Sequence, residues 1–298
     1  MPAMLPYTRD LVLIGGGHAH ALVIKAWGMD PLPGARLTVI NPGPTAPYTG
    51  MLPGHVAGHY RCNELEIDLV RLCRHAGARL ILDKAVDINQ SRREVILESR
   101  GALAYDVASI DVGITAKLDL LGFAGFGIGA KPLNMYAERW RSFLAQVVKG
   151  QSASDVAVIG GGIAGCELAM AMAFALRSAG ISPRVTVIES GPQITGVGGK
   201  ARQRILMAMS GLGIVVKTCV TVVEVMADKV LLDGQESVSA AFCVGAAGGR
   251  AHKWIFQTSL PQINGFIKIG TDLGVVGDQA LFAVGDCAVM DKRLLPKA

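Results

Sequence analysis

The stretch that decides the fold is DLVLIGGGHAHALVIKAW, residues 10–27, in which a short apolar run meets three glycines and an apolar, helix-compatible segment follows. This order predicts a strand, a tight turn and a helix. RLTVIN, residues 36–41, lies at the right distance to be a second parallel strand. Together these segments predict a βαβ unit, whose glycines let a phosphate approach the positive end of the helix.

The same pattern returns in SDVAVIGGGIAGCELAMAMAFAL, residues 154–176, and RVTVIES, residues 184–190, matches RLTVIN almost letter for letter. Each copy continues with two strands joined by a polar turn. Each then ends in an apolar strand that runs into glycine, SIDVG at 109–113 and AFCVG at 241–245. Two copies of one nucleotide-binding unit explain the chain length, and the sequence therefore predicts an α/β fold with two Rossmann-like domains.

The second copy has a complete fingerprint in Gly160, Gly162 and Gly165, and Glu189 ends its next strand. A carboxylate in this place accepts hydrogen bonds from both hydroxyls of an adenosine ribose, and it repels a 2′-phosphate. The second copy is therefore expected to bind NADH in preference to NADPH.

The first copy departs from the fingerprint at two positions. Gly15 and Gly17 are present, but His20 fills the third glycine position and Asn41 fills the acidic one. We expect His20 to hold the helix slightly further from the strand. Asn41 is expected to bond a ribose hydroxyl less strongly than a carboxylate would.

Composition excludes several other classes of protein. The 298 residues carry a net charge of +5, and no basic run is interleaved with aromatic residues, so nucleic acid is not an expected partner. The six cysteines form no CxxC pair, and the N-terminus lacks the pattern of a secretory signal. No apolar run is long enough to cross a bilayer. A reduced, cytoplasmic protein without a metal site is expected.

With two fingerprints in this order, the chain resembles the two-dinucleotide-binding-domain flavoproteins of the pyridine nucleotide–disulfide oxidoreductase superfamily. LGVVGDQALFAVGDCAVM, residues 273–290, resembles the second FAD signature of that family. The resemblance implies three-layer ββα domains, with FAD bound by residues 1–117 and 256–298. An inserted NAD(P)H domain is implied at residues 118–255, and the C-terminal interface or membrane domain of the family is expected to be absent.

The resemblance also implies which residues touch the cofactors. FAD contacts are implied at Gly15, Gly16, Gly17, His18, Ala19, His20, Asn41, Thr49, Gly50, Met51, Val86, Gly113, Gly285 and Asp286. NADH contacts are implied at Gly160, Gly162, Ile163, Ala164, Gly165, Glu189 and Gly245.

Two residues are candidates for a part in catalysis. Glu167 is expected to position the nicotinamide, the alternative being a favourable charge in the first turn of a helix. Lys131 is expected to place a positive charge near the flavin, the alternative being a solvated lysine.

The segment PYTGMLPGHVAGHY, residues 47–60, distinguishes subgroups of the family. The disulfide reductases carry a CxxxxC pair on the first helix, and HAHALVIKAW has no cysteine. The segment instead resembles the flavin-side loop of type II NADH:quinone dehydrogenases and sulfide:quinone reductases. It resembles most closely the flavoprotein module fused ahead of selenophosphate synthetase in some bacteria. Tyr48, Met51 and Leu52 would then form an apolar wall near the flavin, the alternative being a structural loop. A metal held by His55 and His59 is not expected.

The sequence thus predicts an FAD-dependent NADH oxidoreductase that passes electrons to a quinone. Alternative acceptors are a selenium or sulfur species, a ferredoxin or a rubredoxin, and a nucleotide-sensing module without turnover is the non-catalytic alternative. Because the chain ends soon after Asp286, we expect it to be part of a longer protein. For that longer protein a homodimer, a peripheral membrane contact and a fusion to selenophosphate synthetase are kept open.

Overall fold

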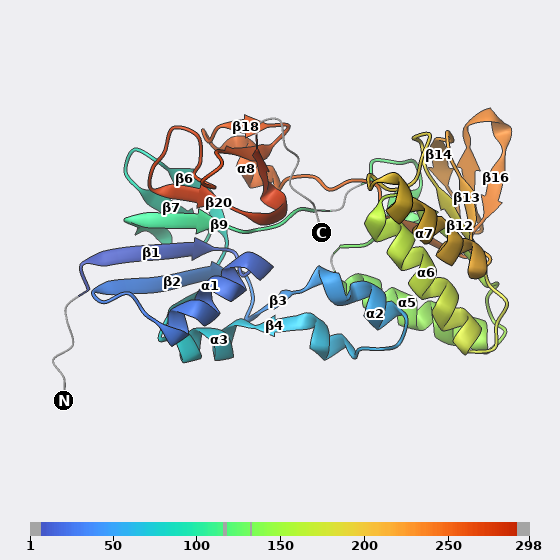
Figure 1. The fold of residues 1–298 in the computed structure, drawn as a ribbon, viewed down its shortest axis with the longest axis horizontal. Helices are drawn as coiled ribbons and strands as arrows, with labels where there is room; N and C mark the ends of the chain where they lie inside the picture. The colour runs from blue at the N-terminus through green and yellow to red at the C-terminus, as the bar shows by residue number, and fades with distance from the viewer. Residues whose placement is uncertain (1–6, 116–117, 132, 291–298) are drawn as a thin grey trace. The chain divides into compact units, whose positions relative to one another are not determined.

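The computed structural model of the protein describes residues 7–115, 118–131 and 133–290 (Figure 1). The chain forms two compact units. The first comprises Met1–Tyr48, Glu66–Thr115 and Arg250–Ala298, and the second comprises Thr49–Leu65 and Ala116–Gly249. The second unit is thus inserted into the chain of the first, and the prediction of an α/β fold with two Rossmann-like domains is confirmed.

The first unit is built on a five-stranded parallel sheet. Its strand order is β20 (Leu281–Ala283), β9 (Val107–Ile110), β1 (Arg9–Ile14), β2 (Ala35–Asn41) and β5 (Arg79–Leu82). Helices α1 (His18–Met29) and α3 (Leu69–Ala76) lie on one face (Figure 1). The antiparallel sheet of β6 (Ala85–Asn89), β7 (Glu94–Leu97) and β8 (Gly101–Ala104) covers the other face.

Strand β1 shows why three layers form. Its successive side chains point to opposite faces of the sheet, as in any strand. Leu13 is buried with Ile24 of α1, whereas Val12 and Ile14 are buried with Val95 of β7. A strand with apolar residues on both faces requires a covering layer on each.

Smaller elements complete the first unit. These are β3 (Thr45–Pro47) paired with β4 (Glu66–Asp68), helix α8 (Lys253–Gln257), and the sheet of β18 (Gln262–Ile263), β19 (Phe266–Ile269) and β21 (Ala288–Met290).

The second unit repeats this plan. Its parallel sheet has the order β10 (Gly127–Gly129), β17 (Phe242–Gly245), β11 (Asp155–Ile159), β12 (Arg184–Ile188) and β13 (Val215–Lys217). Helices α5 (Leu133–Val148), α6 (Ile163–Ser178) and α7 (Gly199–Gly211) share a core with one face. The antiparallel sheet of β14 (Val222–Val225), β15 (Lys229–Leu232) and β16 (Ser237–Ser239) shares a core with the other. The short helix α4 (Phe123–Phe126) precedes β10.

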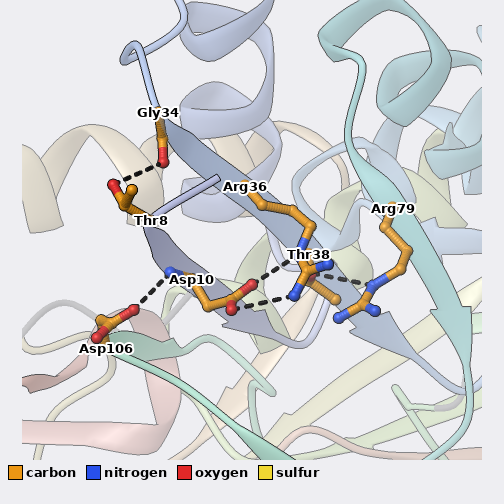
Figure 2. Close-up of polar contacts among 7 residues, drawn as sticks. All are labelled: Thr8, Asp10, Gly34, Arg36, Thr38, Arg79 and Asp106. Carbon is orange, nitrogen blue, oxygen red and sulfur yellow. Dashed lines mark hydrogen bonds and ion pairs between the residues drawn. The ribbon is translucent and has the colours of Figure 1, made fainter. Parts of the chain in front are cut away.

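One ion pair occurs at the same place in both units. Asp10 and Arg36 face each other across β1 and β2 and form two hydrogen bonds of 2.7 and 3.0 Å (Figure 2). Asp155 and Arg184 do the same across β11 and β12, at 2.6 and 3.0 Å. Each pair lies four residues before the end of its first strand, so the repeat seen in the sequence extends to the register of the strands.

The ion pair of the first unit belongs to a larger polar cluster at the amino ends of its strands. Asp106 accepts a hydrogen bond of 2.7 Å from the backbone N–H of Asp10, and Arg79 donates to the hydroxyl of Thr38 at 3.2 Å (Figure 2). Ligands of parallel α/β sheets bind at the carboxyl ends. This cluster lies at the opposite end of the strands, so we assign it to holding the strands together and not to binding a ligand.

Helix α3 has well-defined ends. The carboxylate of Asp68 accepts a 2.9 Å hydrogen bond from the backbone N–H of Arg71, and Gly77 ends the helix with a φ of 59°. Asp68→Ala is expected to lower the free energy of unfolding by about 1 kcal/mol, because the cap is lost. Urea denaturation measures the change. Asp68→Ser retains a capping oxygen and should stay close to wild type, and equal losses in both variants would contradict this role.

No helix within the described ranges is long and apolar enough to cross a bilayer.

Candidate functional site

A cavity of about 410 Å³ lies at the carboxyl end of the second sheet. Gly160, Gly162, Glu189, Thr221 and Ala246 are among the residues that line it. Strand β11 here has β17 on one side and β12 on the other, so the direction of chain progression reverses at this point. Such a crevice is where open α/β sheets bind their ligands.

The glycines of the loop between β11 and α6 are required for different reasons. A Cβ atom on Gly165 would overlap the carbonyl oxygen of Gly160, so the third glycine lets α6 pack against β11. A Cβ atom on Gly162 would meet nothing within 4 Å, and its φ of −64° suits any residue. The chain itself gives no reason for glycine at position 162. A cofactor phosphate that approaches the backbone does, and the loop therefore fits a dinucleotide.

Glu189 is held in place by the same loop. Its Oε2 accepts a 2.7 Å hydrogen bond from the backbone N–H of Gly161, and its Oε1 accepts one of 2.7 Å from that of Gly191. The carboxylate is half-buried and lines the cavity. Oε1 also accepts from the hydroxyl of Ser190 at 3.4 Å, so Oε2 is the oxygen that keeps acceptor capacity for a ligand hydroxyl, since a carboxylate offers about four acceptor sites.

Asn41 holds the equivalent place in the first unit. Its Oδ1 accepts a 3.0 Å hydrogen bond from the N–H of Gly16, as Glu189 does from Gly161. Its Nδ2 donates to the carbonyl oxygens of Gly43 and Thr45 at 2.8 and 3.1 Å. Both amide hydrogens are therefore used within the chain. Only Oδ1 has capacity left for a ribose hydroxyl, and that contact stays a prediction.

His20 is accommodated by hydrogen bonds beneath the first loop. Its Nδ1 lies 2.7 Å from the carbonyl oxygen of Gly15, and its Nε2 lies 2.8 Å from the hydroxyl of Ser109. A carbonyl only accepts, so Nδ1 carries the proton and Nε2 accepts from Ser109. Burial lowers the pKa of His20, and the opposing effect of Asp111 is smaller. His20 is thus neutral, and no local sequence pattern indicated its partner Ser109 on β9.

Asp111 is a buried residue of the site that sequence reasoning missed. Only 5% of it is exposed, and its Oδ2 accepts hydrogen bonds from the backbone N–H groups of Ala19 and His20 at 3.1 and 3.2 Å. It therefore caps the first turn of α1. The signal in the sequence was an acidic residue directly after the apolar strand that ends at Ile110.

Other residues expected to contact FAD lie around the glycine loop between β1 and α1. Gly113 follows β9 with a φ of +65°, and a Cβ atom there would point into open space. Gly285 and Asp286 follow β20, the strand next to β9. These residues share the carboxyl edge of one sheet with the exposed His18. The first loop therefore also fits a dinucleotide.

Val86 lies elsewhere. It is half-buried in β6, where the pairing with β7 shifts register between Ala85 and Asp87.

The segment Pro47–Tyr60 differs in part from expectation. Thr49–Leu65 packs with the second unit, although the sequence placed it with the first. Leu52 and Val56 of α2 (Leu52–Val56) are buried in the second core, and Trp140 Nε1 donates a 3.1 Å hydrogen bond to the carbonyl of Val56. The core encloses the side chain of Leu52, and its part in an apolar wall near the flavin stays a prediction.

The remaining residues of this segment are more accessible. Gly50 is exposed, Thr49 and Met51 are half-buried, and the ring of Tyr48 lies 4.9 Å from that of His18. Contact of Thr49, Gly50 and Met51 with a flavin stays a prediction.

The two candidate catalytic residues lie in the second unit. Glu167 is exposed on the first turns of α6, and Lys131 is half-buried ahead of α5. Of the NADH contacts implied by resemblance, Ile163 and Ala164 are exposed at the start of α6, and Gly245 is buried at the end of β17.

The histidines of the segment have partners within the chain. His55 Nδ1 lies 2.8 Å from the carbonyl oxygen of Tyr60, and the ring of His59 lies 5.3 Å from that of Phe174. Among the described residues, no group of three or more His, Cys, Asp or Glu side chains could hold a metal ion.

The cysteines near the two loops are buried thiols. Burial raises the pKa of Cys166 to about 11 and that of Cys287 to about 12. Both are protonated at neutral pH, and a protonated thiol is a poor nucleophile.

The family model described as pyridine nucleotide-disulphide oxidoreductase matches residues 9–298. The nitric oxide reductase FlRd-NAD(+) reductase of Klebsiella pneumoniae is 31% identical over 150 residues, which cover 48% of this chain and 38% of that protein. The demethylphylloquinone reductase NdbB of Synechocystis sp. is 26% identical over 240 residues, which cover 76% of this chain and 57% of that protein.

A solved structure has the same fold. NDH2 of Plasmodium falciparum in complex with NADH matches with a TM-score of 0.79 and 17% identity, over 95% of this chain and 64% of that one. The match with the two curated relatives thus spans about 38% and 57% of their lengths.

Proposed function

Because the chain belongs to the pyridine nucleotide-disulphide oxidoreductase family, we propose that it is an FAD-dependent NADH oxidoreductase. The observation that carries the proposal is the pair of glycine-rich loops, each set between a parallel strand and a helix at the carboxyl edge of its sheet. FAD binds residues 1–117 and 256–298, and NADH binds residues 118–255. Bound FAD accepts a hydride from NADH and passes two electrons to an acceptor.

In the second unit, the chain binds and orients the nucleotide. The first N–H groups of α6 hold the pyrophosphate, with Gly162 allowing its approach. Glu189 accepts hydrogen bonds from the ribose hydroxyls and repels the 2′-phosphate of NADPH. Glu167 positions the nicotinamide, and Lys131 places a positive charge near the flavin.

In the first unit, the loop after β1 binds the FAD pyrophosphate. Asn41 and Val86 contact the adenosine part, whereas Gly285 and Asp286 contact the ribityl chain. On resemblance alone, Thr49, Gly50 and Met51, which belong to the second unit, contact the flavin.

The proposed acceptor is a quinone. The name of the Synechocystis relative, demethylphylloquinone reductase, supports this class. A disulfide acceptor is disfavoured, since α1 has no cysteine and the thiols of Cys166 and Cys287 are buried. A redox protein is the second candidate, favoured by the Klebsiella relative, whose name joins NAD(+) to nitric oxide reductase FlRd. Resemblance of the segment Pro47–Tyr60 alone supports a selenium or sulfur species.

Three further proposals concern the full-length protein: a homodimer, a peripheral contact with a membrane, and a fusion to selenophosphate synthetase. Each rests on resemblance of GGGHAH and the segment Pro47–Tyr60 to proteins with those properties.

Anaerobic titration of the FAD-reconstituted protein with NADH tests the function. We expect the flavin absorption bands to bleach with NADH and far less with NADPH at the same concentration. Adding a short-chain quinone should restore them. NADH binding without bleaching would instead show a nucleotide sensor, and equal bleaching by both nucleotides would contradict the role of Glu189.

A further inference from the structure

The two loops differ at one position that bears directly on phosphate binding. The N–H of Asp111 donates to the carbonyl of Ile14 at 2.8 Å, and that of Ala246 donates to the carbonyl of Ile159 at 2.8 Å. Since Ile14 and Ile159 each end the strand before a glycine loop, Asp111 and Ala246 occupy equivalent places. One unit has a carboxylate there and the other has a methyl group.

The carboxylate of Asp111 occupies donors that a phosphate would otherwise use. It accepts from the second and third N–H groups of α1, those of Ala19 and His20. Among the described residues, this leaves the N–H groups of Gly17 and His18 at the start of the helix for a ligand. Ala246 has a methyl side chain that accepts no hydrogen bond, so the side chain at this position leaves the corresponding donors of α6 unoccupied.

Gly17 is adapted to this carboxylate. A Cβ atom on Gly17 would overlap the carboxyl group of Asp111, whereas one on the equivalent Gly162 would enter open space. The second glycine of the first fingerprint therefore makes room for a group of the chain itself.

The charge of Asp111 is not neutralised locally. The neighbouring His20 is neutral, with its ring nitrogens engaged by Gly15 and Ser109. Within the described ranges, Asp111 forms no ion pair. A buried negative charge at the helix terminus repels an incoming pyrophosphate over a few ångströms of weakly screening protein.

We propose that Asp111 is an affinity-determining residue of the first loop, which occupies two amide donors of α1 and weakens the binding of an anionic dinucleotide. The inference rests on the proposed function, in which this dinucleotide is FAD. The second loop has no carboxylate at this position, so it binds its nucleotide with all of the first N–H groups of α6.

The test exchanges the side chains at the two equivalent positions of the full chain. Asp111→Asn keeps an oxygen that caps α1 and removes the charge, and we expect the Kd for FAD to fall about tenfold. Ala246→Asp places the charge in the second unit, and we expect the Kd for NADH to rise about tenfold. Ala246→Asn is the neutral control. Kd values come from quenching of flavin fluorescence and from NADH fluorescence, and thermal unfolding of each variant is measured beside them.

A Kd for FAD that is equal in wild type and Asp111→Asn, with both proteins folded, would make Asp111 a cap alone and overturn the inference. If Asp111→Asn binds no FAD, the inference is also overturned, because removal of the charge should leave a loop that binds. If neither Asp111→Asn nor the wild-type protein binds FAD, the proposed function is refuted as well. Equal Kd values in the two proteins would leave the proposed function intact.

Discussion

Gly165→Ala is expected to abolish NADH binding at micromolar protein and to destabilise the second unit. The added methyl group would overlap the carbonyl oxygen of Gly160, which is backbone and cannot rotate away. Helix α6 must therefore move from β11. Overpacking of this kind costs about 1–3 kcal/mol in free energy of unfolding. Movement of the helix terminus takes its amide donors away from the pyrophosphate, and we expect the Kd for NADH to rise about a hundredfold. NADH fluorescence titration and urea denaturation measure the two effects.

Gly162→Ala, three residues away in the sequence, is the matched control for stability. Its methyl group would enter open space at a φ of −64°, so stability should stay within about 1 kcal/mol of wild type. NADH affinity should still fall at least about tenfold, because the methyl group stands where the pyrophosphate approaches. Wild-type affinity in Gly162→Ala would show that this loop does not hold a dinucleotide.

Glu189→Gln is expected to lower the preference for NADH over NADPH by about a hundredfold. The carboxylate accepts one hydrogen bond from Gly161 and one from Gly191, and an amide can accept only on its single oxygen. One buried donor thus loses its partner, and the repulsion of a 2′-phosphate disappears. Hydrogen bonds to a charged group are worth about 1.5–3 kcal/mol, which sets the size of the change.

The preference is measured as the ratio of the Kd values for the two nucleotides. Glu236→Gln removes another glutamate charge of the second unit, one that pairs with Lys217 on the surface, and should leave the ratio unchanged. A ratio that moves equally in both variants would assign the effect to net charge and not to Glu189.

Much of the fold could be predicted from local patterns. The strand, turn and helix around Gly15 and those around Gly160 depend on residues within about one βαβ unit of each other, and both were found. The similarity of the sequences RLTVIN and RVTVIES also identified the repeat that places Asn41 and Glu189 in equivalent positions.

The contacts that sequence reasoning missed join residues far apart in the chain. Asp111 caps a helix 92 residues before it, and Ser109 lies 89 residues from the ring of His20. No local periodicity reports such pairs. Leu52 and Val56 are different, since their spacing of four residues indicates a buried helix face, and this pattern was outweighed by the neighbouring glycines and prolines.

The route of the chain limits how the protein can be dissected. The polypeptide passes from one unit to the other at residues 48–49, 65–66, 115–116 and 249–250, which makes four crossings. Residues 116–249 taken alone would lack Leu52 and Val56, and the indole of Trp140 would lose its acceptor. Residues 116–249 are therefore not expected to fold as a self-sufficient module, and a fragment that keeps this core intact must also include Thr49–Leu65.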